Sequence, residues 1–373
     1  MSLPRILYWS ELFWPAIGGI ETFGAAVLPK LAERGYQIDV LSGDYDGSQP
    51  AFEVMRGVRI HRLPLRAAIA SNDPGTMLDA IAEVRRLKIE VAADVQHLNF
   101  SGPMVFFHLR TAGVHPAPLF THFHNTLDML RPSGSVMAEI FARSDWFVAN
   151  SRMVRDDVLL AAPAIADRTS IIYCGVEPSP SPAAIDPAGP PVLLFVGRLI
   201  RDKGVDLALQ ALAALRERFP DARLLVAGDS DERPALEALA GALGLSDAVE
   251  FLGWVRPAEV PSLMRRSTLL LMPSRWREPF GLVAVEAALQ CRPVIGTTGG
   301  GLEEIIVDGV TGRLIPRDDG AALADAAAAL LSDRPALAAM GTRARDHAAR
   351  LFGLDASADG LDRLYRQLAG PGV

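Results

Sequence analysis

The feature that most constrains the fold of this chain is an alternation of short apolar runs with longer amphipathic segments. The amphipathic segments, such as ETFGAAVLPKLAERG and TMLDAIAEVRRLKIEVAA, have apolar residues three and four positions apart, a spacing typical of α-helices. Apolar strands separated by helices indicate parallel sheets that are covered on both faces. The strands predicted in the first half are RILYWS, QIDVLSG, RIHRLP, DVQHLNF, PLFTHFH, DWFVANS and TSIIYCG.

The alternation is interrupted by the aperiodic stretch EPSPSPAAIDPAGPP, residues 177–191, which we interpret as an interdomain linker. It restarts with the predicted strands PVLLFVG, ARLLVAG, VEFLGWV, TLLLMPS, PVIGTT and GRLIP. We therefore predict an α/β protein with two doubly wound, Rossmann-like domains, residues 1–176 and 192–355, facing each other across a cleft. Residues 356–373 are predicted as a C-terminal helix, and its return to the N-terminal domain is left open. Ligands of such sheets bind at the carboxyl ends of the strands.

Composition narrows the class of protein. A length of 373 residues, half of them hydrophobic, suits two cores, and the net charge of −7 argues against nucleic acid as a partner. Two cysteines far apart in sequence predict no disulfide framework and a reducing compartment. There is no apolar run of about eighteen residues, and the N-terminus lacks the basic start of a signal peptide. We therefore expect a cytoplasmic protein.

A group of cations in a helical pattern leaves open whether the protein makes a weak peripheral contact with a membrane. Arg85, Arg86 and Lys88 lie close together there and could touch anionic lipid headgroups. A solvated helix face is the alternative interpretation, and it is the more common one for such a group.

Two strand ends carry groups suited to a diphosphate. Gly18 and Gly19 lie between a strand and a helix, where backbone amides can approach an anion, although the dinucleotide fingerprint G-x-G-x-x-G is missing. In the second half, FVGRLIRDKG places Arg198 directly after a strand and Lys203 just before the next helix. A planar guanidinium and a compact ammonium at one loop suit phosphate oxygens. An ordinary turn and a solvated basic loop are the respective alternatives.

The stretch SRWREPFGLVAVE places Glu278 at a strand end and Glu286 two turns into the following helix. The first amides of that helix, at Gly281 and Leu282, are predicted to lack intrahelical partners and to be available to a phosphate or sugar oxygen. The two acids would then hold two parts of a long, polyhydroxylated ligand. A surface acid and an unrelated acid within a helix are the alternative.

Three of these stretches together resemble the retaining nucleotide-sugar glycosyltransferases of the GT-B fold, family 4 or group 1. They are FVGRLIRDKG, EPFGLVAVEA with its Glu-x7-Glu spacing, and the N-terminal GGIE. SIIYCGVE also resembles the strand that enters the interdomain linker of this family. The resemblance covers almost the whole chain, in order.

The resemblance implies roles for the residues of the second half. Arg198 and Lys203 would neutralise the donor diphosphate, and Glu286 would bind the ribose hydroxyls. Glu278 would hold hydroxyls of the donor sugar. The backbone around Phe280, Gly281 and Leu282 would help to hold the sugar. Such enzymes usually need no metal, so no metal and no cofactor are expected.

The resemblance also implies roles in the first half. Gly18 and Gly19 would let the N-terminal domain close on the diphosphate and the acceptor. The family has a histidine near the reacting sugar, and His124 is the better match of the pair His122 and His124. A metal pair is the alternative for these two histidines, but two ligands make an incomplete site. His97 also ends a strand and is the weaker candidate.

One departure from the family concerns Asp229-Ser230-Asp231, where the family often has Gly-x-Gly-Pro. Like Asp44-Tyr45-Asp46, this stretch reads Asp-x-Asp, which is a metal–diphosphate signature of a different glycosyltransferase fold. We expect neither to bind metal, because two acids in a polar loop are common. Base recognition is expected near FLGWV, where Trp254 could pack and backbone atoms would do much of the reading.

The sequence therefore predicts a retaining glycosyltransferase that transfers a sugar from a nucleotide diphosphate sugar to a hydroxyl of a glycan, a lipid-linked acceptor or a small molecule. A nucleotide-sugar epimerase, hydrolase or phosphorylase on the same fold is one alternative. A non-catalytic nucleotide-sugar sensor is another. The donor base, the donor sugar and the acceptor are not determined by the sequence.

Overall fold

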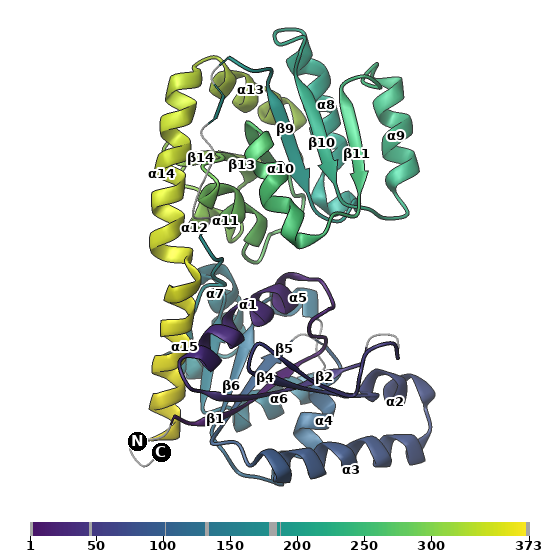
Figure 1. Cartoon of the computed structure of the whole chain (residues 1–373), viewed down its shortest axis with the longest axis vertical. Helices are drawn as coiled ribbons and strands as arrows, with labels where there is room; N and C mark the ends of the chain where they lie inside the picture. The colour runs from purple at the N-terminus through teal and green to yellow at the C-terminus, as the bar shows by residue number, and fades with distance from the viewer. Residues whose placement is uncertain are drawn as a thin grey trace. The chain divides into compact units, whose positions relative to one another are not determined.

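The structure is a computed structural model that describes residues 3–44, 47–100, 102–130, 134–178, 185–186 and 188–370 (Figure 1). The chain divides into two compact units, each with its own sheet. The N-terminal unit holds the residues up to Glu177 together with those from Leu354 onward, and the C-terminal unit holds Pro178–Gly353. The chain therefore passes from one unit to the other at two places.

The N-terminal unit is built on a sheet with the order β3-β4-β2-β1-β5-β6-β7-β8. Neighbouring strands are parallel except for β3 and β4, which form an antiparallel pair. Strand order reverses between β1 and β5, so their carboxyl ends mark the ligand-binding position of a doubly wound sheet. The strands are β1 (Arg5–Ser10), β2 (Gln37–Gly43), β3 (Phe52–Met55), β4 (Val58–Leu63), β5 (Val95–Phe100), β6 (Leu119–Phe123), β7 (Trp146–Ala149) and β8 (Thr169–Ile171).

Helices cover this sheet because their apolar faces match its buried strands. Helix starts are marked by capping residues: Asp73 accepts a hydrogen bond from the Thr76 amide, and Ser151 accepts one from the Val154 amide. The helices are α1 (Gly19–Glu33), α2 (Leu65–Ser71), α3 (Pro74–Val91), α4 (Val105–Arg110), α5 (Leu127–Leu130), α6 (Gly134–Arg143), α7 (Arg152–Ala161), the 3-10 turn η1 (Pro163–Arg168) and α15 (Leu354–Ala369).

The C-terminal unit is built on a wholly parallel sheet with the order β11-β10-β9-β12-β13-β14. Here strand order reverses between β9 and β12, so the loops that follow these two strands meet at the same edge. The strands are β9 (Val192–Val196), β10 (Arg223–Ala227), β11 (Val249–Gly253), β12 (Leu269–Met272), β13 (Val294–Thr297) and β14 (Gly312–Ile315).

The helices of this unit are rich in Ala and Leu, and their buried residues form one core with the strands. Together, the two parallel-sheet units confirm the predicted pair of doubly wound, Rossmann-like domains. The helices are η2 (Arg201–Lys203), α8 (Val205–Arg216), α9 (Arg233–Ala242), η3 (Pro257–Glu259), α10 (Val260–Arg266), α11 (Leu282–Leu289), α12 (Leu302–Ile305), α13 (Gly320–Leu331) and α14 (Arg334–Phe352).

The segment interpreted as a linker, residues 177–191, lies in part outside the described residues. Of its described part, Ile185 is buried in the core of the C-terminal unit, and the carbonyl of Gly189 accepts a hydrogen bond from Arg334 Nη2 at 2.7 Å. These contacts attach the end of the segment to the C-terminal unit. The second passage between units falls between Gly353 and Leu354.

Of the three cations of α3 named as a group that could touch lipid headgroups, Lys88 does not face solvent. Lys88 is fully buried: its Nζ donates to the carbonyl of Thr111 at 3.1 Å and lies 5.2 Å from the centre of the Trp9 ring. Arg86 forms ion pairs with Glu83 and Glu90, both at 2.9 Å. Sequence periodicity missed the burial of Lys88 because a lysine is counted with the polar face of a helix, whereas here its ammonium has a carbonyl and an aromatic ring as buried partners. No helix of the described chain is long and apolar enough to cross a membrane.

The buried Lys88 makes stability depend on pH. Burial lowers its pKa to about 7, so between pH 7 and the ordinary lysine pKa the unfolded chain holds the extra proton, and stability rises with pH. We expect Lys88→Met to remove this rise. The melting temperature of the variant minus that of the wild type should be more positive at pH 7 than at pH 9. Equal differences at the two pH values would contradict a neutralised Lys88.

Candidate functional site

The edge where β9 and β12 end positions the residues predicted to bind the donor. After β9 come Gly197, Arg198 and the turn η2, which ends at Lys203. Gly204 then starts α8 with a φ of 72°, and a Cβ there would lie 2.2 Å from the carbonyl oxygen of Pro273. Only glycine fits this approach, so the loop after β9 lies directly against the loop after β12.

Lys203 and Glu278, from these two loops, form an ion pair. Nζ of Lys203 donates to Oε1 of Glu278 at 2.5 Å, and the hydroxyl of Ser274 donates to the same oxygen at 2.8 Å. The Glu278 side chain is only 7% exposed and that of Lys203 19%. Lys203 is therefore only partly exposed, because the carboxylate draws the ammonium onto the face of Trp276, 4.5 Å from the ring centre. The two residues are one electrostatic unit.

Arg198 differs from Lys203. It is exposed, and it forms no hydrogen bond or ion pair within the described part of the chain. Its guanidinium therefore remains available to an anion at the same edge. The two cations predicted together are both at the carboxyl end of β9, but one is free and the other is already paired with an acid.

Arg275 holds the two loops together and was not identified from the sequence. Its guanidinium makes two hydrogen bonds of 2.7 Å to the carboxylate of Asp206, at the start of α8. It also donates to Asp318 at 2.6 Å and to the carbonyl of Arg201 at 2.9 Å. A bidentate pair of this kind fixes geometry. The sequence offered no signal for it, because Arg275 and Asp206 are far apart along the chain.

The start of α11 has the features expected of an oxygen-binding helix end. Gly281 precedes the helix with a φ of 119°, and no side chain caps the amides that follow it. Leu282 is the first helical residue. Phe280, in contrast, is buried with its ring against Phe352, 5.6 Å between centres, so any contact of Phe280 with a ligand would come from its backbone.

Glu286 lies in α11 and is partly buried. No described residue donates a hydrogen bond to its carboxylate, and burial raises its pKa to about 7. The structure thus separates the two predicted acids: Glu278 is paired with a cation, whereas Glu286 is unpaired and titrates near neutrality.

This difference gives a pH prediction for Glu286. If its carboxylate accepts hydrogen bonds from the donor, the donor KM should rise up to about tenfold per pH unit as pH falls below 7, because the group is then protonated in the free enzyme. In Glu286→Gln the donor KM should be higher at pH 8 and nearly independent of pH. Initial rates at pH 5.5–8.5 test this. If the donor KM of Glu286→Gln depends on pH as that of the wild type does, another group causes the pH dependence.

In the N-terminal unit, Gly18 and Gly19 follow β1 at the reversal of strand order. Gly18 precedes α1 with an extended backbone, φ −171°, so no left-handed conformation requires glycine there. A Cβ at Gly18 would meet Oε2 of Glu21 at 2.3 Å. Glycine therefore allows the Glu21 carboxylate to fold back over the start of the helix, and burial raises the pKa of this acid.

His124 is buried at the end of β6, and both of its ring nitrogens have partners. Nε2 lies 2.8 Å from Oδ1 of Asn99, and Nδ1 lies 3.5 Å from the sulfur of Cys174. Burial lowers its pKa to about 3, so the ring is neutral at physiological pH. His122 lies beside it, 4.0 Å between ring centres, and His97 is bonded to His122 at 3.3 Å.

Of the two Asp-x-Asp stretches, the structure describes Asp229-Ser230-Asp231 in full and the other only in part. Tyr45 and Asp46 lie outside the described residues. Asp229 pairs with Arg233 at 3.3 Å, and the Ser230 hydroxyl donates to the carbonyl of Leu199, so this loop folds back on its own unit. Within the described ranges, no group of three His, Cys, Asp or Glu residues could hold a metal ion. Trp254, after β11, is 60% exposed.

Comparison with known proteins agrees with this arrangement. The family model for glycosyl transferases group 1 matches residues 182–347, and the model for glycosyltransferase family 4 matches residues 17–180. A D-inositol 3-phosphate glycosyltransferase of Xylanimonas cellulosilytica is 30% identical, over 94% of this chain and 92% of that protein. An alpha-D-kanosaminyltransferase of Streptomyces kanamyceticus is 35% identical, over 48% of this chain and 46% of that protein.

Solved structures share the fold. The crystal structure of Anabaena Alr3699/HepE in complex with UDP and glucose superposes with a TM-score of 0.77 at 22% identity, covering 97% of this chain and 99% of that chain. A glycosyltransferase from Rickettsia africae gives a TM-score of 0.80 at 18% identity and covers both chains completely. Two Rossmann-like domains of this kind define the GT-B fold. The chain belongs to the group 1 glycosyltransferases of this fold, which confirms the resemblance found in the sequence.

Proposed function

We propose that the protein is a retaining glycosyltransferase that transfers a sugar from a nucleoside diphosphate sugar to an acceptor hydroxyl. The observation that carries the proposal is the meeting of Arg198, Lys203 and Glu278 at the carboxyl edge of one parallel sheet. Two cations and an acid at the reversal of strand order suit a ligand that joins a diphosphate to a hydroxylated sugar.

The C-terminal unit would bind the donor. Arg198 and Lys203 would neutralise the diphosphate, aided by the first amides of α11 at Gly281 and Leu282. Glu278 would accept hydrogen bonds from the sugar hydroxyls, next to the backbone of Phe280. Glu286, as the unpaired acid, would bind the ribose hydroxyls. UDP, present in the HepE structure, is the first donor nucleotide to test.

The N-terminal unit would contribute Gly18, Gly19 and His124. The glycine amides would approach the diphosphate and the acceptor. His124 would act as a neutral, fixed ring near the reacting sugar rather than as a proton carrier, since its nitrogens are already bonded to Asn99 and Cys174. Proton transfer would then depend on the substrates.

The proposed chemistry is substitution on the front face of the sugar. The bond from the anomeric carbon to the phosphate oxygen breaks, and the bond to the acceptor oxygen forms on the same face. The departing phosphate oxygen takes the acceptor proton. Hydrogen bonds from Lys203 and Ser274 disfavour nucleophilic attack by Glu278, which supports this route over a covalent intermediate. The protein cations would stabilise the leaving group, so we propose that no metal is required.

The names of the relatives favour one class of acceptor among glycans, lipid-linked acceptors and small molecules. The Xylanimonas relative is named for D-inositol 3-phosphate, and we propose a small polyhydroxylated acceptor for this chain as well. The test below also includes lipid-linked acceptors and glycans.

A thermal-shift panel of UDP, GDP, ADP and dTDP sugars tests the donor, because a ligand that binds only the folded state raises the melting temperature. The stabilising donor is then incubated with acceptors of the three classes. The anomeric configuration of the product is read by proton NMR. We expect retention. An inverted product would refute the proposed mechanism, and donor conversion without an acceptor would favour an epimerase or hydrolase. Tight binding without any turnover would favour a sensor.

A further inference from the structure

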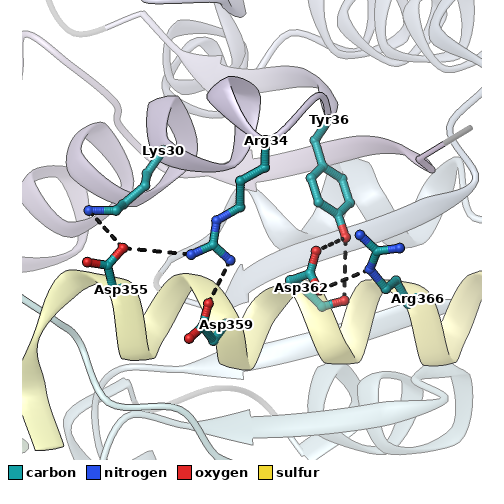
Figure 2. Close-up of polar contacts among 7 residues, drawn as sticks. All are labelled: Lys30, Arg34, Tyr36, Asp355, Asp359, Asp362 and Arg366. Carbon is teal, nitrogen blue, oxygen red and sulfur yellow. Dashed lines mark hydrogen bonds and ion pairs between the residues drawn. The ribbon is translucent and has the colours of Figure 1, made fainter. Parts of the chain in front are cut away.

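Helix α15 is attached to the N-terminal unit by polar contacts with α1 and the residues after it. Lys30 pairs with Asp355 at 2.9 Å and Arg34 pairs with Asp359 at 2.8 Å (Figure 2). The Tyr36 hydroxyl donates to Oδ1 of Asp362 at 2.7 Å (Figure 2). The two ion pairs lie at the surface of the interface, where the carboxylates of Asp355 and Asp359 are largely exposed, whereas Tyr36 is buried.

One residue of α15 makes a different contact. Tyr365 is fully buried, and its hydroxyl lies 2.9 Å from Nδ1 of His97 in β5. Nε2 of His97 lies 3.3 Å from Nδ1 of His122 in β6, and the His122 ring lies against that of His124. A continuous series of buried polar groups therefore leads from the C-terminal helix to the histidine assigned to the proposed site.

The hydrogen-bond pattern determines which nitrogen of each ring carries the proton. His97 Nδ1 is the only hydrogen-bond acceptor within reach of the Tyr365 hydroxyl among the described residues, and a buried hydroxyl proton without an acceptor is costly, so we assign Tyr365 as the donor and Nδ1 as the acceptor. Because burial keeps His97 neutral, its proton is then on Nε2, which donates to Nδ1 of His122. His122 in turn carries its proton on Nε2, a buried donor that has no partner among the described residues.

His124 adopts the same tautomer for an independent reason. The side-chain amide nitrogen of Asn99 donates to the carbonyl of Trp9 at 2.8 Å, which turns its Oδ1 toward His124. Nε2 of His124 must then donate to that oxygen. Its Nδ1 is left to accept from the thiol of Cys174, and burial raises the pKa of this thiol and keeps it protonated.

We propose that Tyr365 is a positioning residue: its hydroxyl sets the tautomers of His97 and His122, and the His122 ring packs against that of His124. The catalytic part of this inference rests on the proposed function, whereas the tautomers do not. A neutral imidazole has one donor and one acceptor, so loss of the Tyr365 donor releases the choice of tautomer at His97 and His122, whereas Asn99 still fixes that of His124.

The test compares Tyr365→Phe with Tyr36→Phe, a matched control that removes the other tyrosine hydroxyl bonded across the same interface. In protein labelled with ¹⁵N-histidine, NMR distinguishes which ring nitrogen is protonated. We expect all three rings to be Nε2-protonated in the wild type and in Tyr36→Phe. Tyr365→Phe should give a mixture of tautomers at His97 and His122. Unchanged tautomers in Tyr365→Phe would overturn the proposal, whether or not the enzyme transfers sugar.

Steady-state kinetics with the donor and acceptor identified above supply the second readout. Tyr365→Phe should lower kcat roughly threefold to tenfold, the range of one neutral hydrogen bond, with little change in the donor KM. An equal loss in Tyr36→Phe would mean that Tyr365 only attaches the helix. If Tyr365→Phe does not fold, 3-fluorotyrosine at position 365 keeps the hydroxyl and makes it a stronger donor. It should shift the Nδ1 resonance of His97, and an unchanged resonance would overturn the assignment.

Discussion

Glu278→Gln is expected to lower kcat by about 10²–10³-fold with little change in the donor KM, the scale of one preorganised electrostatic contact. Glu278 precedes Pro279 in the loop between β12 and α11, and a residue before proline prefers an extended backbone. Its carboxylate would accept hydrogen bonds from the sugar and favour positive charge that develops at the anomeric carbon. Glutamine keeps the size and loses the charge.

Two control variants separate charge from geometry at this position. Ser274→Ala removes one hydrogen bond to Glu278 but keeps the charge, and its kcat should fall about tenfold or less. Glu286→Gln should chiefly raise the donor KM, as expected for binding that is the same in the ground state and the transition state. If Glu286→Gln abolishes kcat and Glu278→Gln changes only KM, the two roles are reversed. If neither variant has an effect, the stretch is structural.

Lys203→Ala is expected to weaken donor binding by about 2–3 kcal/mol, which is roughly a 30-fold to 150-fold rise in the donor Kd. The substitution should also lower the melting temperature, because Glu278 is buried and would lose its cation. Arg198→Ala should weaken donor binding without destabilising the fold, since Arg198 is exposed and has no partner in the described structure. Calorimetric titration with the nucleoside diphosphate and thermal unfolding measure both effects.

A double variant separates the two consequences of losing Lys203. In Lys203→Ala/Glu278→Gln no buried charge is left unpaired, so stability should recover toward that of the wild type while donor binding stays weak. Unchanged donor affinity in both Lys203→Ala and Arg198→Ala would refute the assignment of the diphosphate to this edge.

Most strands of the fold can be predicted from the local pattern of apolar residues in the sequence. Strands such as β1 and β2 coincide with the runs RILYWS and QIDVLSG, because near-continuous apolar runs mark strands buried on both faces. The exception is β3, residues Phe52–Met55, which was not predicted. It is an edge strand with Phe52 and Val54 exposed, joined to β4 by a turn with positive φ at Arg56 and Gly57. A short, half-exposed strand has too little apolar pattern to be recognised.

The positions of the candidate site residues could be predicted, but their partners could not. Arg198, Lys203 and Glu278 follow strands, and parallel strands bring their carboxyl ends to one edge. Which cation pairs with Glu278 depends on side-chain packing between segments 75 residues apart. The clamp of Arg275 on Asp206 is non-local in the same way. The hydrogen bond between Tyr365 and His97 joins residues 268 positions apart, which no local pattern in the sequence can indicate.

The division of the N-terminal unit into two stretches of sequence has a consequence for biosynthesis. A ribosome that adds about 5–20 residues per second needs roughly 10–35 s to make Pro178–Gly353 before α15 can emerge. During that time the nascent N-terminal unit lacks Tyr365, and Nδ1 of His97 lacks its hydrogen-bond partner. The same discontinuity governs the engineering of hybrid enzymes: an exchange of N-terminal domains between relatives must carry α15 with it, or the transplanted unit will receive a helix evolved for another surface.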